Sequence, residues 1–317
     1  MKNFVAGPNE EGVRLSRFVE GVTHNMPKSL LYKAFRNKRV KVNGKKQDPD
    51  YRIHQGDLLE LYINDEFFPA QPQKAPPKKR QPKVQVIWED ENIAILYKPT
   101  HLLCHSDRTG DPNLVDAFRA YLEEKGEYDP HAPSRFAPAI CNRLDRGTEG
   151  LVIAAKNYPS LRDMNAIIQQ DLLNKTYLTI TFGFPPEGRH TAYLWHNEKT
   201  NKVTVRKRPA EGYKEILTQV KIEEKKGPFA LCRIGLITGR THQIRAHLAY
   251  LNAPVLGDIK YGNRTINEKL KQRTQNLCAV KIAFKEIPQE NTLHYLTGQV
   301  FKLPSPAILE KFHQLEG

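Results

Sequence analysis

The stretch NRLDRGTEGLVIAAK, Asn142 to Lys156, places an acidic residue between two arginines at the entrance to a predicted strand. Asp145 lies between Arg143 and Arg146, a glycine-containing turn follows, and the aliphatic run 151–155 is typical of a strand. A carboxylate where a loop meets a strand is open to ligands and is held by a rigid element. From this stretch alone, Asp145 is either a turn residue that bonds its own backbone or a catalytic carboxylate, and turn residues are the more common.

The charge of the chain favours a polyanionic partner. The chain has 317 residues, with Lys+Arg 49 against Asp+Glu 35 and a formal net charge of +14 at pH 7. Such an excess is typical of proteins that bind nucleic acid, although a generally basic soluble protein would share it. The length suits one large domain and one small domain.

Signals for targeting and for metal binding are missing from the sequence. The N-terminus lacks an apolar core of signal-peptide length, and no uninterrupted apolar run is long enough to cross a membrane. The cysteines are far apart and lack the spacing of metal ligands; they are Cys104, Cys141, Cys232 and Cys278. We therefore expect a soluble, cytoplasmic protein with free thiols and no bound metal.

A segment rich in proline and lysine divides the chain. It is FFPAQPQKAPPKKRQPK, Phe67 to Lys83, and all of its charges are positive. Because prolines disfavour both helix and sheet, we expect an extended linker over 65–83. The linker separates an N-terminal module, 1–64, from a larger region, 84–317.

The N-terminal module has the pattern of two helices followed by a hairpin. Apolar residues at helical spacing predict helices through 15–22 and, after Pro27, through 30–35. Asn-Gly at 43–44 indicates a β-hairpin, and GDLLELYI, 56–63, predicts a closing strand. Cations cluster from the second helix to the hairpin: Lys33, Arg36, Lys38, Arg39, Lys41, Lys45 and Lys46. They suit the sugar-phosphate backbone of folded RNA, or they form a solvated helix face without a partner.

In the larger region the pattern predicts strands at 84–88 and 93–97, a helix near 114–122, and a longer strand within LLNKTYLTITFG, Leu172 to Gly183. In that longer strand Tyr177 alternates with apolar residues, which predicts one buried face and Tyr177 on the opposite face. Its ring is then either a platform for a nucleobase or an ordinary packing residue between strands.

The stretch ITGRTHQIRAHLAYLNAPVLGDIKYG, Ile237 to Gly262, predicts a loop that leads into a helix capped by Thr241. Arg240, His242 and Arg245 near the start of this helix would form a pocket that favours anions. Phosphate binding without chemistry would explain the same cluster.

The chain lacks the common cofactor-binding and nucleophile motifs. It has no G-x-x-x-x-G-K-[ST] loop, no G-x-G-x-x-G after a strand, no H-x-E with C-x-x-C, and no G-x-S-x-G. Nucleotide hydrolysis, dinucleotide or methyl-donor chemistry and zinc-dependent deamination are thereby disfavoured. We expect a reaction that needs no cofactor.

Together these segments resemble the RluA-type family of pseudouridine synthases. The family pattern H-R-L-D-R-x-T-S-G corresponds to 142–150, K-x-Y to 175–177, and G-R-[TS]-H-Q-[IL]-R-x-H to 239–247, the last without exception. A strand that ends in N-K-P-x-G-L-x-x-H corresponds to 97–105, and P-V-L-G-D-x-x-Y-G follows the helix as expected. The resemblance extends from Val84 to the C-terminal helix.

Several residues depart from the family pattern. Tyr97 stands for the common Asn, Asn142 for His, Glu149 for Ser, and Cys278 for the His of a later L-H-A. None of them removes the aspartate, the tyrosine or the helix arginine. They leave open to which subgroup the chain belongs and which RNA it uses, and bear less on whether it can catalyse the reaction.

Residues 13–63 resemble the small RNA-binding domain shared with ribosomal small-subunit protein four, here called the S-four-type domain. Such a domain in front of the synthase region is common in the RluA-type family, and the combination is similar to an RluC/RluD-like subgroup. As a family, this domain implies binding to structured RNA.

The resemblance implies an α+β fold, with a mixed, largely antiparallel sheet in the catalytic domain and a small N-terminal α/β RNA-binding domain. It implies that Asp145 acts on the ribose as nucleophile or base, that Tyr177 stacks on the flipped uracil, and that Arg245 forms an ion pair with Asp145. The residues expected to contact RNA are Arg143, Arg146, Arg240, His242, Lys33, Arg36, Lys38, Arg39 and Lys41.

The implied substrate is structured RNA, above all large-subunit ribosomal RNA, and the implied enzyme is a monomer without metal or cofactor. Two alternatives stay open. The same chemistry on transfer RNA is one, and a non-catalytic RNA-binding factor for ribosome assembly is the other.

Overall fold

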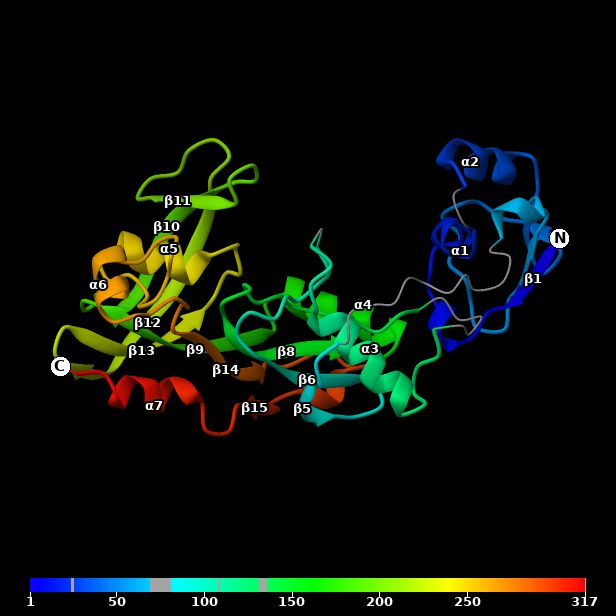
Figure 1. The fold of residues 1–317 in the computed structure, drawn as a ribbon. Helices are drawn as coiled ribbons and strands as arrows, with labels where there is room; N and C mark the ends of the chain where they lie inside the picture. The colour runs from blue at the N-terminus through cyan, green and yellow to red at the C-terminus, as the bar shows by residue number, and fades with distance from the viewer. Residues whose placement is uncertain (24–25, 69–80, 108, 131–135, 317) are drawn as a thin grey trace.

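The computed structural model describes residues 1–23, 26–68, 81–107, 109–130 and 136–316, and these form a four-stranded and an eleven-stranded sheet. Figure 1 shows the small sheet with its two helices at one end of the molecule and the large sheet through the rest. Most of the predicted linker, 69–80, lies outside the described residues. The part before it is folded, because Asp65–Phe67 form a short 3-10 helix, η2, and Phe68 is buried in the core of the N-terminal module.

The N-terminal module is an antiparallel sheet of order β1-β4-β2-β3 with two helices packed against it. Its elements are β1 (Lys2–Val5), η1 (Pro8–Glu10), α1 (Leu15–Val22), α2 (Lys28–Arg36), β2 (Val40–Val42), β3 (Lys45–Lys46) and β4 (Leu58–Leu61). Asn43 and Gly44 both have positive φ, 50° and 77°, as a tight hairpin between β2 and β3 requires. Of the apolar residues that predict α2, Leu31, Ala34 and Phe35 are buried, whereas Leu30 is 39% exposed.

The large sheet has the order β11-β10-β12-β13-β9-β14-β8-β6-β5, with β15 beside β14 and β7 beside β8. Its strands are β5 (Gln85–Glu89), β6 (Ile93–Lys98), β7 (Ala139–Ile140), β8 (Glu149–Ala155), β9 (Leu173–Phe182), β10 (Gly188–Asn197), β11 (Lys202–Arg206), β12 (Lys214–Lys226), β13 (Phe229–Leu236), β14 (Leu277–Phe284) and β15 (Val300–Lys302). All described neighbours pair antiparallel except β14 and β8, which are parallel. The predicted α+β fold with a mixed, largely antiparallel sheet is confirmed.

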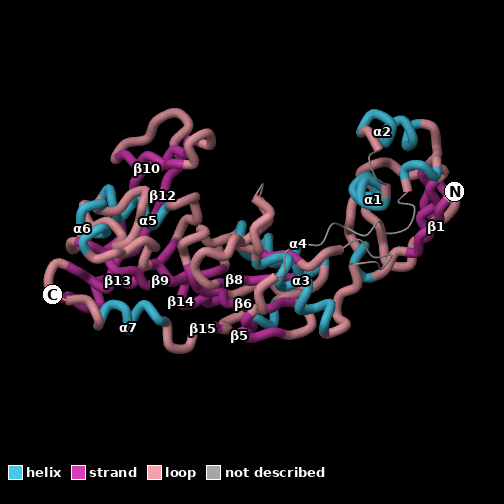
Figure 2. Tube along the Cα trace, in the orientation of Figure 1, coloured by secondary structure: helices cyan, strands magenta, loops and turns pink. Residues whose placement is uncertain are grey.

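Short helices pack around this sheet, as the tube view in Figure 2 shows. They are α3 (Leu114–Glu124), α4 (Tyr158–Gln169), α5 (Gln243–Tyr250), α6 (Arg264–Lys269), η3 (His294–Leu296) and α7 (Ala307–His313). Asn113, Asn157 and Asn263 cap α3, α4 and α6, each accepting a hydrogen bond from a backbone N–H in the first turn. In the part of the chain that the structure describes, no helix has the length and apolar character needed to span a membrane.

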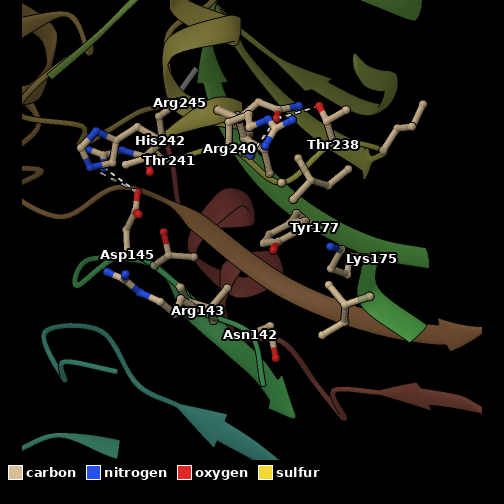
Figure 3. A pocket seen from close by; sticks show the side chains of 18 of the residues that line it. Asn142, Arg143, Asp145, Lys175, Tyr177, Thr238, Arg240, Thr241, His242 and Arg245 are labelled. Atoms are coloured by element: carbon tan, nitrogen blue, oxygen red, sulfur yellow. Dashed lines mark hydrogen bonds and ion pairs between the residues drawn. The ribbon is translucent and has the colours of Figure 1, made fainter. Parts of the chain in front are cut away.

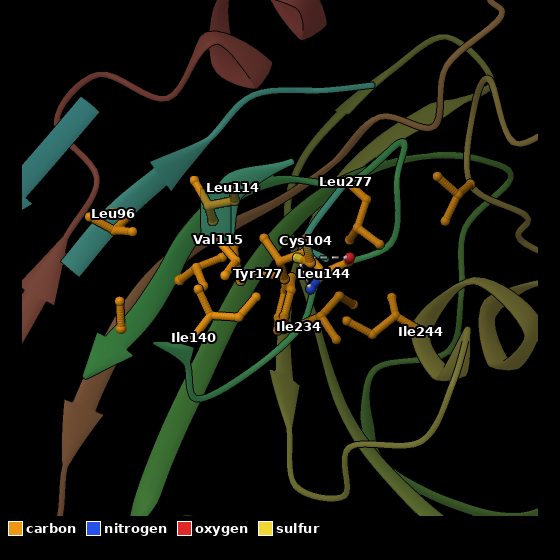
Figure 4. Close-up of a cluster of buried hydrophobic side chains, with 14 of the residues drawn as sticks. Leu96, Cys104, Leu114, Val115, Ile140, Leu144, Tyr177, Ile234, Ile244 and Leu277 are labelled. Atoms are coloured by element: carbon orange, nitrogen blue, oxygen red, sulfur yellow. Dashed lines mark hydrogen bonds between the residues drawn. The ribbon is translucent and has the colours of Figure 1, made fainter. Parts of the chain in front are cut away.

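Strand β9 is buried on both faces, which corrects the expectation of one buried face. Leu178 and Ile180 pack on the face that α7 covers, whereas Tyr177 belongs to the core cluster on the other face (Figure 4). Thr179 and Thr181 on that second face are also fully buried. The cause is the position of β9 between β13 and β14, in the middle of the sheet, where both faces are covered.

Gly150 is the residue that lets β8 and β14 run side by side. It has φ +122°, and a Cβ added there would lie 2.3 Å from the carbonyl oxygen of Ala279 on β14. Backbone cannot move aside as a flexible side chain can, so this position needs glycine. The contact fixes the strand that begins directly after the Asp145 loop.

We predict that Gly150→Ala destabilises the fold, with Gly188→Ala as the matched control. Gly188 also has a positive φ, +108°, but open space around the added Cβ, so its substitution introduces backbone strain alone. The clash with Ala279 should lower the free energy of unfolding by roughly 1–3 kcal/mol more in Gly150→Ala than in the control. Urea denaturation of both variants measures the difference; equal losses would contradict the role given to this contact.

Candidate active site

A cavity of about 800 Å³ brings together three segments that are far apart in the sequence. It is lined by residues 141–145 and Thr148 before β8, by the start of β9, and by residues 236–245 between β13 and α5. Asp145, Tyr177 and Arg245, the predicted catalytic residues, all line it, one from each segment (Figure 3). A concave site with a few convergent polar groups is typical of ligand binding.

The ion pair expected between Asp145 and Arg245 is present. Arg245 Nη1 donates to Asp145 Oδ2 at 2.7 Å, and the guanidinium is 4% exposed. On its other edge, Nε and Nη2 donate to the two carboxylate oxygens of Asp258 at 2.6 and 2.9 Å. This bidentate contact fixes the plane of the guanidinium and therefore the direction from which it reaches Asp145.

The charge of Arg245 is maintained by these carboxylates. Burial alone would lower its pKa, but the hydrogen bonds and charges of Asp258 and Asp145 outweigh burial and raise the pKa above its usual value. Asp145 Oδ1 accepts no hydrogen bond from the described residues, so one carboxylate oxygen is held and the other is available in the cavity.

The loop before α5 is organised by Gln243 and not by the predicted cap Thr241. Helix α5 begins at Gln243, and its N-cap residue, His242, has a left-handed backbone with φ +55°. The side-chain oxygen of Gln243, Oε1, accepts from the backbone N–H of Arg240 at 3.0 Å and from the Thr238 hydroxyl at 2.9 Å. Gln243 thus replaces the expected side-chain cap and fixes the turn that carries His242 to the cavity.

Tyr177 presents a neutral phenol to the cavity. Burial, with a smaller contribution from the Asp145 charge, raises its pKa above the usual value. The side chain is 6% exposed and lies among apolar core residues, including Ile234 and Leu277 (Figure 4). A ring held in this way offers a flat apolar face, and its hydroxyl keeps its proton at neutral pH.

The predicted RNA-binding residues of the large region differ in their placement. Arg143 and Arg240 are exposed and line the cavity. Arg146 is exposed too but is absent from the lining, and its guanidinium forms an ion pair with Asp111 at 3.0 Å. His242 is only 9% exposed, and its Nε2 lies 3.9 Å from Asp145 Oδ2.

The five predicted cations of the N-terminal module lie on α2, on the turn after it and on β2. Lys33, Arg36, Lys38 and Arg39 are exposed, and Lys41 is half-buried with its ammonium 5.2 Å from the centre of the Tyr62 ring. In Figure 1 this module lies at the opposite end of the molecule from α5, so these residues are not part of the cavity.

Sequence reasoning gave no role to Asp258, Tyr261 and Lys98, although each lies in a family motif. Lys98 is fully buried, and its ammonium donates to the carbonyls of Pro99, Leu102 and Arg146 at 2.9, 2.8 and 3.3 Å. Burial lowers its pKa to about 8. It ties the end of β6 to the loop that carries Asp145. The sequence signal for a role of Lys98 was its charge at the end of an otherwise apolar strand.

Three of the four departures named above are neighbours. The Tyr97 hydroxyl donates to Glu149 Oε2 at 3.0 Å, and Glu149 pairs in register with Cys278 across the parallel strands β8 and β14. Lys311 of α7 lies 3.7 Å from the same carboxylate. The fourth, Asn142, accepts a hydrogen bond from the Ile153 amide at 2.8 Å. These residues are therefore satisfied within the protein, around the loop of Asp145.

Comparisons with known proteins point to one family. Residues 92–250 match the family described as RNA pseudouridylate synthase. An RNA pseudouridine synthase of Mycoplasma capricolum is 31% identical over 95% of this chain and 96% of its own length, and the ribosomal large subunit pseudouridine synthase C of Salmonella typhimurium is 26% identical over 94% and 90%. The structure of human RNA pseudouridylate synthase domain containing 4 shares the fold with a TM-score of 0.51, at 20% identity over 69% of this chain and 94% of that one.

We predict that Asp258→Ala strongly destabilises the large region. It leaves a buried guanidinium with Asp145 as its remaining carboxylate, and removing one partner of a buried pair costs about 3–5 kcal/mol. Urea denaturation measures this loss. The control is Glu268→Ala, which breaks the exposed pair with Arg264, 2.7 Å apart, and should leave the unfolding midpoint unchanged. Similar midpoints for both variants would contradict the account of Arg245.

Proposed function

The chain belongs to the RNA pseudouridylate synthase family and is an RNA pseudouridine synthase, and from this premise we propose that it isomerises specific uridines of large-subunit ribosomal RNA. The ribosomal enzymes among its relatives support this substrate, as do the net charge of +14 and the exposed cations of α2. Transfer RNA is the second candidate. The third, a non-catalytic assembly factor, is disfavoured by the family membership and by the intact Asp145, Tyr177 and Arg245.

The observation that carries the mechanism is the asymmetry of the Asp145 carboxylate. Arg245 holds Oδ2, and Oδ1 is available to a ribose in the cavity. In the reaction the bond from C1′ to N1 of uracil breaks, the base rotates, and a bond from C1′ to C5 forms. The C5 proton leaves and N1 gains a proton, so nothing is oxidised and no group is donated. Asp145 acts on the ribose as nucleophile or as base.

Tyr177 is proposed to bind the detached uracil by stacking. A target base must leave its stack to enter a pocket, at a cost of a few kcal/mol, and a flat apolar ring compensates part of that cost. The raised pKa of Tyr177 favours this role over that of a base that removes the C5 proton. Arg143 and Arg240, exposed on the cavity lining, are suited to the phosphates that flank the flipped nucleotide.

The N-terminal module is proposed to be an RNA-binding domain of the S-four type. Its exposed cations on α2 would contact phosphates, at a distance from the reacting uridine. We further propose that the protein acts as a monomer in the cytoplasm. It should need no cofactor, because isomerisation of a uridine requires no second reactant.

We predict that Asp145→Asn abolishes turnover. The assay measures tritium released from C5 of labelled uridine in unmodified large-subunit ribosomal RNA. The rate should fall at least about a thousandfold, because an amide can serve neither as nucleophile nor as base here. Glu268→Ala, exposed and absent from the cavity lining, should keep the wild-type rate. Full activity of Asp145→Asn would overturn the mechanism, and release from transfer RNA alone would overturn the proposed substrate.

We also predict that replacing Lys33, Arg36 and Arg39 together with alanine flattens the salt dependence of RNA binding. Each lost phosphate contact reduces the slope of log K against log salt by about 1. The control keeps the charges, as Lys33→Arg with Arg36→Lys and Arg39→Lys. A filter-binding titration across salt concentrations measures both; an unchanged slope in the alanine variant would contradict the role of α2.

A further inference from the structure

The hydroxyl of Tyr261 lies between two polar groups that differ in whether they can donate or accept a hydrogen bond. The Val203 amide of β11 donates to it at 2.9 Å, and Nδ1 of His242 lies 2.9 Å away on the other side. A backbone amide only donates, and a phenol has a single proton to give. Among the described residues, His242 Nδ1 is the one acceptor hydrogen-bonded to this hydroxyl. Directing the phenol proton to Nδ1 is therefore the arrangement that gives it an acceptor among the described residues.

This contact determines where His242 carries its own proton. A neutral imidazole has one nitrogen that donates and one that accepts. Because Nδ1 accepts from Tyr261, the proton is on Nε2, and Nε2 is the atom 3.9 Å from Asp145 Oδ2. The neutral state is favoured as well: burial, with the charges of Arg245 and Lys260, outweighs the opposing charge of Asp145 and lowers the pKa of His242. Figure 3 shows the ring directed at the Asp145 carboxylate.

The backbone at His242 is strained in a way that suits a positioned side chain. His242 has φ +55° and ψ 16°, the left-handed region that is unfavourable for a residue with a Cβ. The hydrogen bonds of Gln243 to Arg240 and Thr238 hold this turn. Such strain persists where the surrounding structure fixes it, and it concentrates at functional sites.

Resting on the proposed function, we propose that Tyr261 holds His242 as the Nε2–H tautomer, and that His242 uses this hydrogen to position the Asp145 carboxylate. At 3.9 Å the contact is longer than a hydrogen bond, and such contacts commonly shorten when substrate closes a site. Oδ2 then receives two donors, Arg245 Nη1 and His242 Nε2–H, and Oδ1 remains for the ribose. A neutral donor orients the carboxylate without adding a second positive charge that would weaken it as nucleophile or base.

Tyr261 also connects this site to the edge of the sheet. Its hydroxyl accepts from β11, its ring lies 5.3 Å from the Arg245 guanidinium, and its amide donates to Asp258 at 3.1 Å. The neighbouring Lys260 ammonium donates to the Asn201 carbonyl, just before β11. The β10–β11 hairpin and the tautomer of His242 are thus held by one residue. Tyr261 is a positioning residue, since it acts through His242.

The tautomer is tested by nitrogen NMR of the full chain labelled with ¹⁵N-histidine, without RNA, at neutral pH. Comparison with His242→Gln identifies the His242 signals. The wild type should show a protonated Nε2 and an unprotonated, hydrogen-bonded Nδ1, and Tyr261→Phe should lose this single tautomer. A protonated Nδ1 in the wild type, or a tautomer unchanged in Tyr261→Phe, would overturn the proposal whether or not the RNA substrate is the one proposed above.

The consequence for the reaction is tested by single-turnover tritium release at saturating RNA. Tyr261→Phe keeps the ring over Arg245 but removes the hydroxyl that holds His242. The rate should therefore fall about tenfold, and the apparent KM, measured by varying the RNA concentration, should stay within about twofold. His242→Gln keeps an amide donor near the Nε2 position and should be faster than His242→Ala. An unchanged rate in Tyr261→Phe, or equal rates in the two His242 variants, would overturn the positioning role.

His242→Gly separates this role from a structural one. Glycine relieves the left-handed strain, so its melting temperature should equal or exceed that of His242→Ala, while its turnover should be as slow. A His242→Gly variant with the wild-type rate would show that the imidazole positions nothing. Loss of activity in Asp145→Asn, tested above, is the separate result on which the proposed function stands.

Discussion

A guanidinium removed from water must be matched by carboxylates, and the placement of Arg245 is the constraint on which the site depends. Arg245 comes from α5, Asp258 from the loop after it, and Asp145 from the loop before β8, so three segments must assemble before the charge is compensated. Asp258 is wholly buried and accepts hydrogen bonds from Nε and Nη2 of Arg245, so that Nη1 is left to orient Asp145. The same arrangement that stabilises the buried cation therefore orients the carboxylate that we propose to react.

Several parts of the fold follow from local sequence because local physics decides them. The Asn-Gly hairpin at 43–44 and the strand that ends at Lys98 are of this kind, and so is the general α+β architecture. Errors arise where tertiary packing decides. Tyr177 and its neighbouring threonines alternate like a half-exposed strand, yet the strand lies in the middle of a covered sheet. The local sequence does not show which of Leu30 and Leu31 is buried. The way α2 packs against the sheet decides that Leu31 is buried and Leu30 is exposed.

The site follows the same division. Asp145, Tyr177 and Arg245 are evident from motifs, since each lies in a short stretch of unusual composition. Their partners are not, because a role such as that of Asp258 or Tyr261 exists only once distant segments meet. The departures Tyr97 and Glu149 look like isolated changes in the sequence and are hydrogen-bonded to each other in the structure. A substitution at one such position is best interpreted together with its partner, on the far side of the loop that carries Asp145.

The most direct test of the account is a map of pseudouridine in ribosomal RNA from cells that lack this chain, with the gene returned as wild type or as Asp145→Asn. The account predicts that specific pseudouridines of the large subunit disappear with the gene, return with the wild type, and stay absent with Asp145→Asn. An unchanged map after deletion, or full restoration by Asp145→Asn, would contradict it.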